Sequence, residues 1–229
     1  ETVFGTPQND VLVGGTGRSV IAGLAGADQI SDNDWLVLDY SASDAGVTIT
    51  ASTPRVLVGH GGHAQGDVIN LSSSTRLDII GSAFNDVLNG TPIVGQFGMN
   101  QIFGGKGNDT INGSSGYNIL HGGDGDDTIN GGYDTDYIYG GAGYDIVRAG
   151  SGYNYVDFGA GGGELIFDVR TYANMQTNEF RSLGYPAGSQ EKTDVIGVFE
   201  NITASSSNDE LHGNEAGNVL KGNGGYDLI

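Results

Sequence analysis

The sequence predicts an all-β fold, a right-handed parallel β-roll that is interrupted by two β-rich inserts. Three observations support this prediction. A nine-residue pattern repeats without a gap from Gly104 to Asp157, and further copies lie near both ends of the chain. The eighth position of every copy in this block is aliphatic. Glycine accounts for 42 of the 229 residues, and it permits the positive φ angles that tight turns between short strands need.

Each copy of the pattern combines a six-residue turn with a three-residue strand. In GGDGDDTIN (122–130), we expect the turn to be built from glycine and aspartate and Ile129 to point inward. Self-similarity at a short fixed period is typical of solenoids, whose stacked units bury one continuous core. Two units should make one turn of the coil, so residues two repeats apart should stack on the same edge at a spacing of about 4.8 Å.

The repeats fall into three blocks. We expect roll segments over residues 1–31, 81–157 and 204–229, and β-rich inserts folded against the roll over residues 32–80 and 158–203. Both ends of the chain interrupt this plan, which favours the interpretation that the sequence is a fragment of a longer array.

Charge and composition exclude several functions. The net charge is −19 with only nine Lys and Arg residues, so self-repulsion opposes compaction and a bound divalent cation would supply the missing counter-charge. No basic cluster is present to contact phosphates, and we expect no nucleic-acid partner. The chain has no cysteine for disulfides or thiolate–zinc sites. No apolar run approaches the ~18 residues of a membrane span.

The sixth position of the repeat carries the candidate ligands. Sorted by the two-repeat period, these positions form two edges of the roll. The first edge consists of Asp10, Asp28, Asp86, Asp109, Asp127, Asp145, Asp209 and Asp227. The second edge consists of Ser19, Asn100, Asn118, Asp136, Asn154 and Asn218. We hypothesise that the first edge is the main metal edge, with Glu164 replacing Asp in one further coil. On the second edge, Asp136 is a further candidate metal ligand, whereas Asn side chains close the turns.

Oxygen-rich turns of this kind suit calcium. Calcium takes six to eight oxygen ligands at roughly 2.3–2.6 Å, and glycine lets backbone carbonyls approach a shared centre while Asp adds a carboxylate. The clean copies at 104–112, 122–130 and 140–148 predict, besides their Asp residues, contributions from Gly104, Gly105, Gly107, Gly122, Gly123, Gly125, Gly140, Gly141 and Gly143. The alternative is that these Asp residues only cap turns.

The pattern GGxGxDxUx, with U aliphatic, resembles the nonapeptide of the RTX (repeats-in-toxin) family of calcium-binding β-rolls. The segment LDYSASDAGVTI (38–49) is similar to spacers of that family, and the resemblance covers most of the chain. It implies several bound Ca²⁺ ions and a chain that folds on meeting calcium outside the cell after type I secretion. It also implies an extracellular location, at a bacterial cell surface.

Catalytic signatures are missing from the sequence. It contains neither HExxH nor GxSxG, and we do not expect an enzyme. His60 and His63, with Asp67 nearby, could bind a transition metal, but a polar loop is the simpler explanation. A possible partner-binding stripe, suited to sugars or proteins, consists of Tyr137, Tyr139, Tyr153 and Tyr155. Cross-strand stacking would account for the same tyrosines.

Three functions remain open at this point. The chain could be a scaffold or assembly unit of a surface layer, filament or adhesin, with copies of itself as partners. It could be a module that binds a cell-surface polysaccharide or another partner. It could also be the calcium-dependent secretion and folding tail of an exoenzyme.

Overall fold

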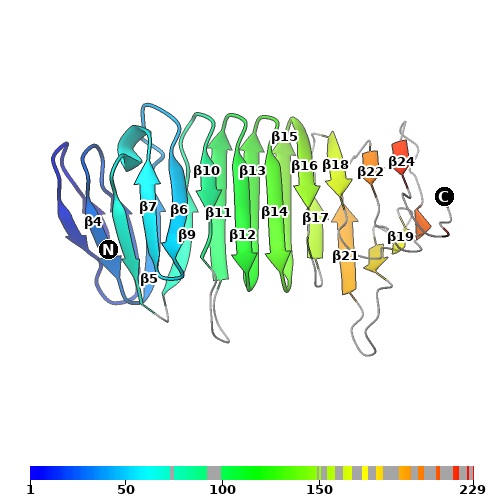
Figure 1. Ribbon diagram of the computed structural model, residues 1–229, viewed down its shortest axis with the longest axis horizontal. Helices are drawn as coiled ribbons and strands as arrows, with labels where there is room; N and C mark the ends of the chain where they lie inside the picture. Colours follow the sequence, from blue (N-terminus) through cyan, green and yellow to red (C-terminus); the bar gives the residue numbers. More distant parts are fainter. Residues whose placement is uncertain are drawn as a thin grey trace.

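The computed structural model describes residues 1–72, 75–91, 99–148 and 150, and beyond them the backbone of strands β17 to β24 and residues 226 and 229. Two 12-stranded sheets, which we call sheet A and sheet B, face each other along the length of the coil (Figure 1). Most neighbouring strands are parallel, as the predicted β-roll requires. The prediction of an all-β roll is therefore confirmed.

Successive strands alternate between the two sheets through most of the chain. Sheet A contains, in spatial order, β1 (Thr2–Phe4), β3 (Arg18–Ala22), β5 (Trp35–Asp39), β9 (Arg76–Ile80), β11 (Met99–Lys106), β13 (Tyr117–Asp124), β15 (Asp136–Ala142), β17 (Asn154–Asp157), β21 (Glu191–Ile196), β20 (Glu179–Ser182), β19 (Tyr172–Asn174) and β23 (Glu210–Leu211). Sheet B contains β2 (Val11–Val13), β4 (Gln29–Asp32), β8 (Val68–Leu71), β7 (Val56–His60), β6 (Thr48–Thr53), β10 (Val87–Asn89), β12 (Thr110–Ser115), β14 (Thr128–Tyr133), β16 (Tyr144–Arg148), β18 (Gly162–Ile166), β22 (Asn201–Thr203) and β24 (Val219–Lys221). A short 3₁₀ helix, η1, spans Gly62–Ala64.

Strand register shows that two nonapeptides make one coil. In sheet B, Ile111 pairs with Ile129, and Ile129 pairs with Val147. In sheet A, Leu120 pairs in the same way with Ile138. Each step is 18 residues, so equivalent positions of alternate repeats stack on one another.

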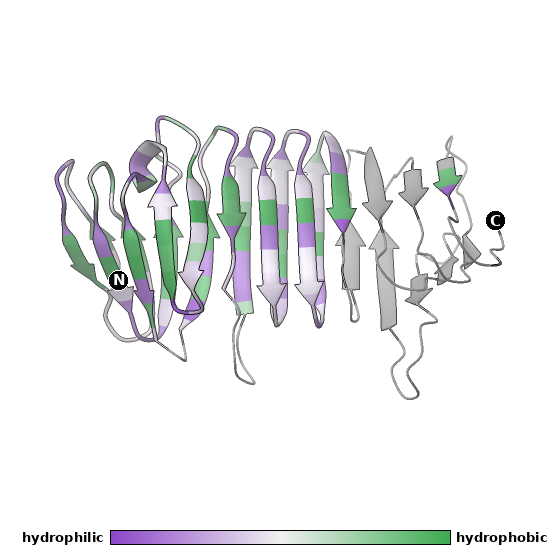
Figure 2. Ribbon diagram, viewed as in Figure 1, coloured by the Kyte–Doolittle hydropathy of each residue, from purple (hydrophilic) through white to green (hydrophobic). Residues whose placement is uncertain are grey.

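The core between the sheets is thin. In the regular part of the roll, each repeat buries one aliphatic side chain completely: Ile102, Ile111, Leu120, Ile129, Ile138 and Val147. Figure 2 shows hydrophobic residues as short bands on strands that are otherwise polar or of intermediate hydropathy. Two such side chains per coil provide limited apolar burial, which makes the turns important for stability.

The first insert has a different position from the one predicted. Segment 32–80 is β-rich as expected, but its strands continue both sheets and do not fold against the roll. Strand β5 pairs with β3 and β9, β8 pairs with β4, and β6 pairs in parallel with β10. The physical reason is that β3 and β4 would otherwise end as open edges with unpaired backbone groups. Strand β7 joins β8 and β6 by antiparallel pairing.

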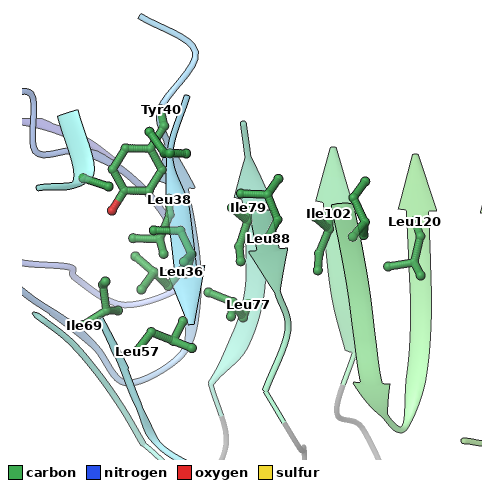
Figure 3. Packing of buried hydrophobic residues seen from close by; sticks show 14 of the residues in the cluster. Leu36, Leu38, Tyr40, Leu57, Ile69, Leu77, Ile79, Leu88, Ile102 and Leu120 are labelled. Carbon is green, nitrogen blue, oxygen red and sulfur yellow. The ribbon is translucent and has the colours of Figure 1, made fainter. Parts of the chain in front are cut away.

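This insert also thickens the core. Its buried residues include Leu36, Leu38, Tyr40, Val47, Ile49, Leu57, Ile69, Leu77 and Ile79. Figure 3 shows the Tyr40 ring packed among several of them, where the regular coils carry a single aliphatic side chain per strand. The insert is therefore the part of the described chain with the densest apolar packing.

Glycine substitutions should separate backbone strain from crowding. Gly17 has φ 81° and open space where a β-carbon would lie, whereas Gly123 has φ 123° and lies against the carbonyl of Gly105 in the neighbouring coil. We expect Gly17→Ala to lower the free energy of unfolding by about 1 kcal/mol, the usual cost of this backbone region for a residue with a β-carbon. Gly123→Ala should cost at least about twice as much, because a clash adds to the strain. Denaturant unfolding measures both, and equal losses would contradict the close stacking of the turns.

Candidate metal centre

The first-edge aspartates stand where the turns enter sheet B. Positive φ angles at Gly105 and Gly107 bend the chain immediately before Asp109, as the glycine pattern predicts. The following residue, Thr110, begins β12. The carboxylates are directed into the roll, and the buried members are Asp28, Asp86, Asp109, Asp127 and Asp145.

One carboxylate oxygen of Asp28, Asp109, Asp127 and Asp145 joins a ladder of hydrogen bonds between coils. The Asp109 backbone N–H donates to Oδ1 of Asp127 (2.8 Å), and the Asp127 N–H donates to Oδ1 of Asp145 (3.0 Å). Asp86 donates to Asp109 (2.8 Å) and Asp10 to Asp28 (2.9 Å) in the same manner. The structure thus places these six residues on one edge, as the two-repeat period predicts.

The second oxygen has no such partner. Oδ2 is buried and accepts no hydrogen bond in Asp28, Asp109, Asp127 and Asp145. A β-carbon placed on Gly104 or Gly122 would overlap the Oδ2 atom of the same repeat and the carbonyl oxygen of the next first-edge glycine. Glycine therefore leaves a small space that is lined by carboxylate and carbonyl oxygens. A hard cation fits this donor set, and an unpaired buried carboxylate oxygen is costly without one.

Burial shifts the acidity of these groups. Loss of hydration and, less strongly, the charges of neighbouring carboxylates raise the pKa of Asp109 and of Asp127 from the ordinary 3.8 to about 7, against the lowering effect of the ladder hydrogen bonds. Burial likewise raises the pKa of Asp145 to about 6. Ionisation at neutral pH is thus unfavourable unless a positive charge is close.

Hydrogen bonds replace charge on the second edge. The Asn118 side chain donates to the Gly116 carbonyl (2.8 Å), and that of Asn100 donates to the Gly113 carbonyl (3.1 Å) and to Oδ1 of Asn118 (2.9 Å). This is the turn-closing role that we predicted for Asn. Asp136 is the exception, and its burial raises its pKa to about 8.

One rung of the first edge was not predicted. The Asp28 N–H donates to Oδ1 of Asp67 (2.9 Å), so Asp67 continues the ladder into the insert. The Tyr40 hydroxyl donates to Oδ2 of Asp67 (2.9 Å), and both side chains are buried. The Tyr40 phenol thus satisfies Oδ2 of Asp67, whereas the equivalent atom of Asp28 in the next rung has no hydrogen bond. The only feature of the sequence that points to this rung is the Gly-Asp pair at 66–67, directly before the strand Val68–Leu71.

The prediction for Glu164 is wrong in register. Backbone pairing aligns Asp145 with Gly163 and Ile146 with Glu164, so Glu164 falls one position after the carboxylate position. The mixed glycine run before it permits this one-residue shift. Asp209, Asp227 and Tyr153 lie outside the described residues, as does the side chain of Tyr155.

Two members of the predicted aromatic stripe, Tyr137 and Tyr139, take part in cross-strand ring contacts. Phe103, His121 and Tyr139 lie face to face on sheet A, with centroid separations of 4.6 Å and interplanar angles of 10° and 6°. Tyr137 tilts against Tyr117 at 5.5 Å. Stacking uses the ring faces that a sugar would otherwise cover. Burial in the stack lowers the pKa of His121, a residue that position alone would assign to solvent.

The ligand atoms available at the first edge restrict which metals could bind there. In the described part of the chain, no three His, Cys, Asp or Glu side chains gather to hold an ion, and His60 and His63 form no such group. Backbone carbonyls must therefore complete any coordination shell at the first edge, which calcium accepts readily.

None of the described helices is both long and apolar enough to cross a membrane.

The raised pKa values predict how pH affects the protein in a chelating buffer. In the unfolded chain these carboxyls titrate near 3.8, whereas Asp109 and Asp127 titrate near 7 in the fold. A group whose pKa rises on folding binds its proton more tightly in the folded state, so protonation favours folding. We expect the free energy of unfolding to be highest below the unfolded pKa and to fall as the pH rises towards 7. Denaturant unfolding at stepped pH tests this, and a rise over the same interval would contradict it.

Comparison with known proteins agrees with this geometry. The family model described as RTX calcium-binding nonapeptide repeat (4 copies) matches residues 4–31, 103–133, 113–147, 130–165 and 199–229. No curated protein matches the chain. The family matches span the first-edge ladder on both sides of the insert and together cover more than half of the sequence. The chain therefore belongs to the family of RTX calcium-binding nonapeptide repeats.

Proposed function

We propose that this chain is a module that folds on binding calcium outside the cell and then serves as a scaffold or assembly unit of a secreted surface protein. The observation that carries the proposal is the row of buried first-edge carboxylate oxygens without hydrogen-bond partners; those of Asp28, Asp109 and Asp127 face a glycine of their own repeat. Calcium binding is a property of the family, whereas the coupling to folding is inferred from this row and the scaffold role from the regularity of the coils.

Electrostatics couples calcium to folding. Asp109, Asp127 and Asp145 stack one coil apart, and the strand spacing between coils is about 4.8 Å. Two unit charges at that distance repel each other by about 3 kcal/mol at an effective dielectric constant of about 20. A cation held between coils reverses the sign of this interaction, and binding free energy at such a site becomes folding free energy.

Segment 35–80 of the insert provides a region that needs no cation. At the sixth position of its coils the strand register places Leu36 and Leu77 on the second edge and Val47 on the first. The carboxylate at the other sixth position, Asp67, is satisfied by the Tyr40 hydroxyl. With its denser core, this segment supports a folded nucleus from which the calcium-dependent coils extend.

The scaffold role rests on regularity. Coils of similar shape stack along one direction, so the fold provides an extended and repetitive body (Figure 1). The polysaccharide-binding alternative is less supported, because the rings of Phe103, His121 and Tyr139 occupy one another's faces. A secretion tail remains the alternative if a catalytic domain accompanies the chain in its parent protein.

Substitution of neighbouring aspartates should separate calcium ligation from general charge. Asp127 is buried with an unpaired oxygen, whereas the adjacent Asp126 is exposed and accepts the Tyr144 N–H. In a calcium titration followed by far-UV circular dichroism, we expect a calcium-specific gain of β signal that magnesium does not reproduce. Asp127→Asn should raise the calcium concentration at the midpoint of this titration at least ~10-fold, which corresponds to a loss of about 1.4 kcal/mol of binding free energy. Asp126→Asn should change this midpoint far less. A β spectrum unaffected by chelation would contradict coupled folding.

Hydrogen exchange in a chelating buffer should reveal the calcium-independent nucleus. We expect amides in segment 35–71 to exchange more slowly than those in 104–148. Tyr40→Phe should remove this protection, because it leaves the buried Oδ2 of Asp67 unpaired at a cost of about 1–3 kcal/mol. The control is Tyr133→Phe, which alters an exposed ring. Uniform exchange across both segments in the wild-type protein would argue against a nucleus.

A further inference from the structure

A buried carboxylate outside the nonapeptide pattern shares the features of the first-edge aspartates. Asp32 ends strand β4, and its side chain is 1% exposed. Its Oδ1 accepts the Asp34 N–H (2.7 Å), whereas its Oδ2 is buried and accepts no hydrogen bond. Neither ion pair in the described part of the chain includes Asp32. An ionised oxygen in this position calls for a cation.

The free oxygen of Asp32 points at a repeat that lacks its own aspartate. A β-carbon placed on Gly14 would overlap Oδ2 of Asp32 and lie 2.8 Å from the Ser19 hydroxyl oxygen. Gly14 opens the repeat GGTGRSVIA (14–22), in which Ser19 occupies the sixth position. Asp32 follows Gly14 by 18 residues, so it comes from the next coil.

The same relation exists in the regular repeats. A β-carbon on Gly104 would overlap Oδ2 of Asp109, and one on Gly122 would overlap Oδ2 of Asp127. In each case a carboxylate oxygen faces the first glycine of the repeat. At Gly14 the facing carboxylate belongs to the following coil, and it fills the place that Ser19 leaves.

The surroundings of Asp32 supply oxygen donors. Ser19 is fully buried, and its hydroxyl oxygen accepts the Gly15 N–H (3.1 Å). The Asp34 carboxylate lies on the same turn but is exposed and accepts the Gly17 N–H (2.9 Å), so it is not one of the ligands. Two cations, Arg18 and Arg76, lie over the Trp35 ring at 5.4 and 4.0 Å. Carboxylate, hydroxyl and carbonyl oxygens favour calcium over metals that prefer nitrogen or sulfur.

We propose that Asp32 and Ser19 hold a calcium ion on the second edge, with backbone carbonyls and water completing its shell. This inference rests on the proposed calcium function of the first edge, and it adds a site at a repeat whose motif contains no aspartate. The second edge thus binds calcium at its N-terminal coils and is held by asparagine hydrogen bonds farther along.

Terbium luminescence provides a site-specific test. Terbium replaces calcium at oxygen-rich sites, and it emits when a nearby excited tryptophan transfers energy to it. Trp35 is the only tryptophan of the chain and follows Asp32 by three positions, which limits the distance between their Cα atoms to about 11 Å. With excitation restricted to tryptophan, we expect emission from the wild-type protein that calcium displaces.

Asp32→Asn should abolish most of this emission and remove one calcium ion per chain in equilibrium dialysis with metal analysis. The amide oxygen can still accept the Asp34 N–H, so the turn should persist. Asp34→Asn is the matched control and should retain both signals. In the Asp32→Asn background, Ser19→Asp returns a carboxylate to the sixth position and should restore the lost ion.

Two further results separate the possible failures. If the wild-type protein binds calcium and Asp127→Asn loses an ion, but Asp32→Asn keeps the wild-type count and emission, the Asp32 site is refuted and the first-edge function stands. If the wild-type protein binds no calcium at all, the proposed function itself is refuted. Loss of emission in both Asp32→Asn and Asp34→Asn, without rescue by Ser19→Asp, would indicate diffuse attraction of cations and would also overturn the site.

Discussion

Repulsion between like charges stacked one coil apart is the constraint on which this fold depends. The first-edge ladder joins neighbouring coils through one carboxylate oxygen, and in Asp28, Asp109, Asp127 and Asp145 it leaves the other oxygen buried without a hydrogen bond. The thin core between sheets A and B contributes little to offset that charge. The glycines, the repeat length and the family's calcium binding all follow from the need to place a cation beside these oxygens.

The two edges stabilise their turns by different chemistry. On the first edge, carboxylates whose pKa is raised by burial require a counter-charge at neutral pH. On the second edge, the neutral amides of Asn100 and Asn118 close the turns with hydrogen bonds to carbonyls. An amide can donate as well as accept, so it needs no ion. The roll thus combines an edge of buried carboxylates with one whose turns are largely closed by neutral hydrogen bonds.

The sequence predicts the periodic features well, because each depends on a signal that recurs every nine residues. The coil, the aliphatic core and the sorting of six aspartates onto one edge all follow from that period. The insert had no such signal, so its integration into both sheets and the Tyr40–Asp67 rung emerge only from tertiary pairing. Glu164 illustrates the complementary error, since a glycine-rich run fits two registers that differ by one residue. The nine-residue period does not point to Asp32, because Asp32 lies outside the sixth position and faces a repeat in the preceding coil.

The direction of the strands has a mechanical consequence. Strands run across the long axis of the coil, so the hydrogen bonds between neighbouring strands lie along that axis (Figure 1). Tension applied along the axis therefore opens the interface between two coils like a zipper, one rung at a time, and does not shear many bonds at once. Ions shared between coils would add a tie at every such interface on the first edge. The extensibility of the roll under load would then depend on the ionic composition of its surroundings.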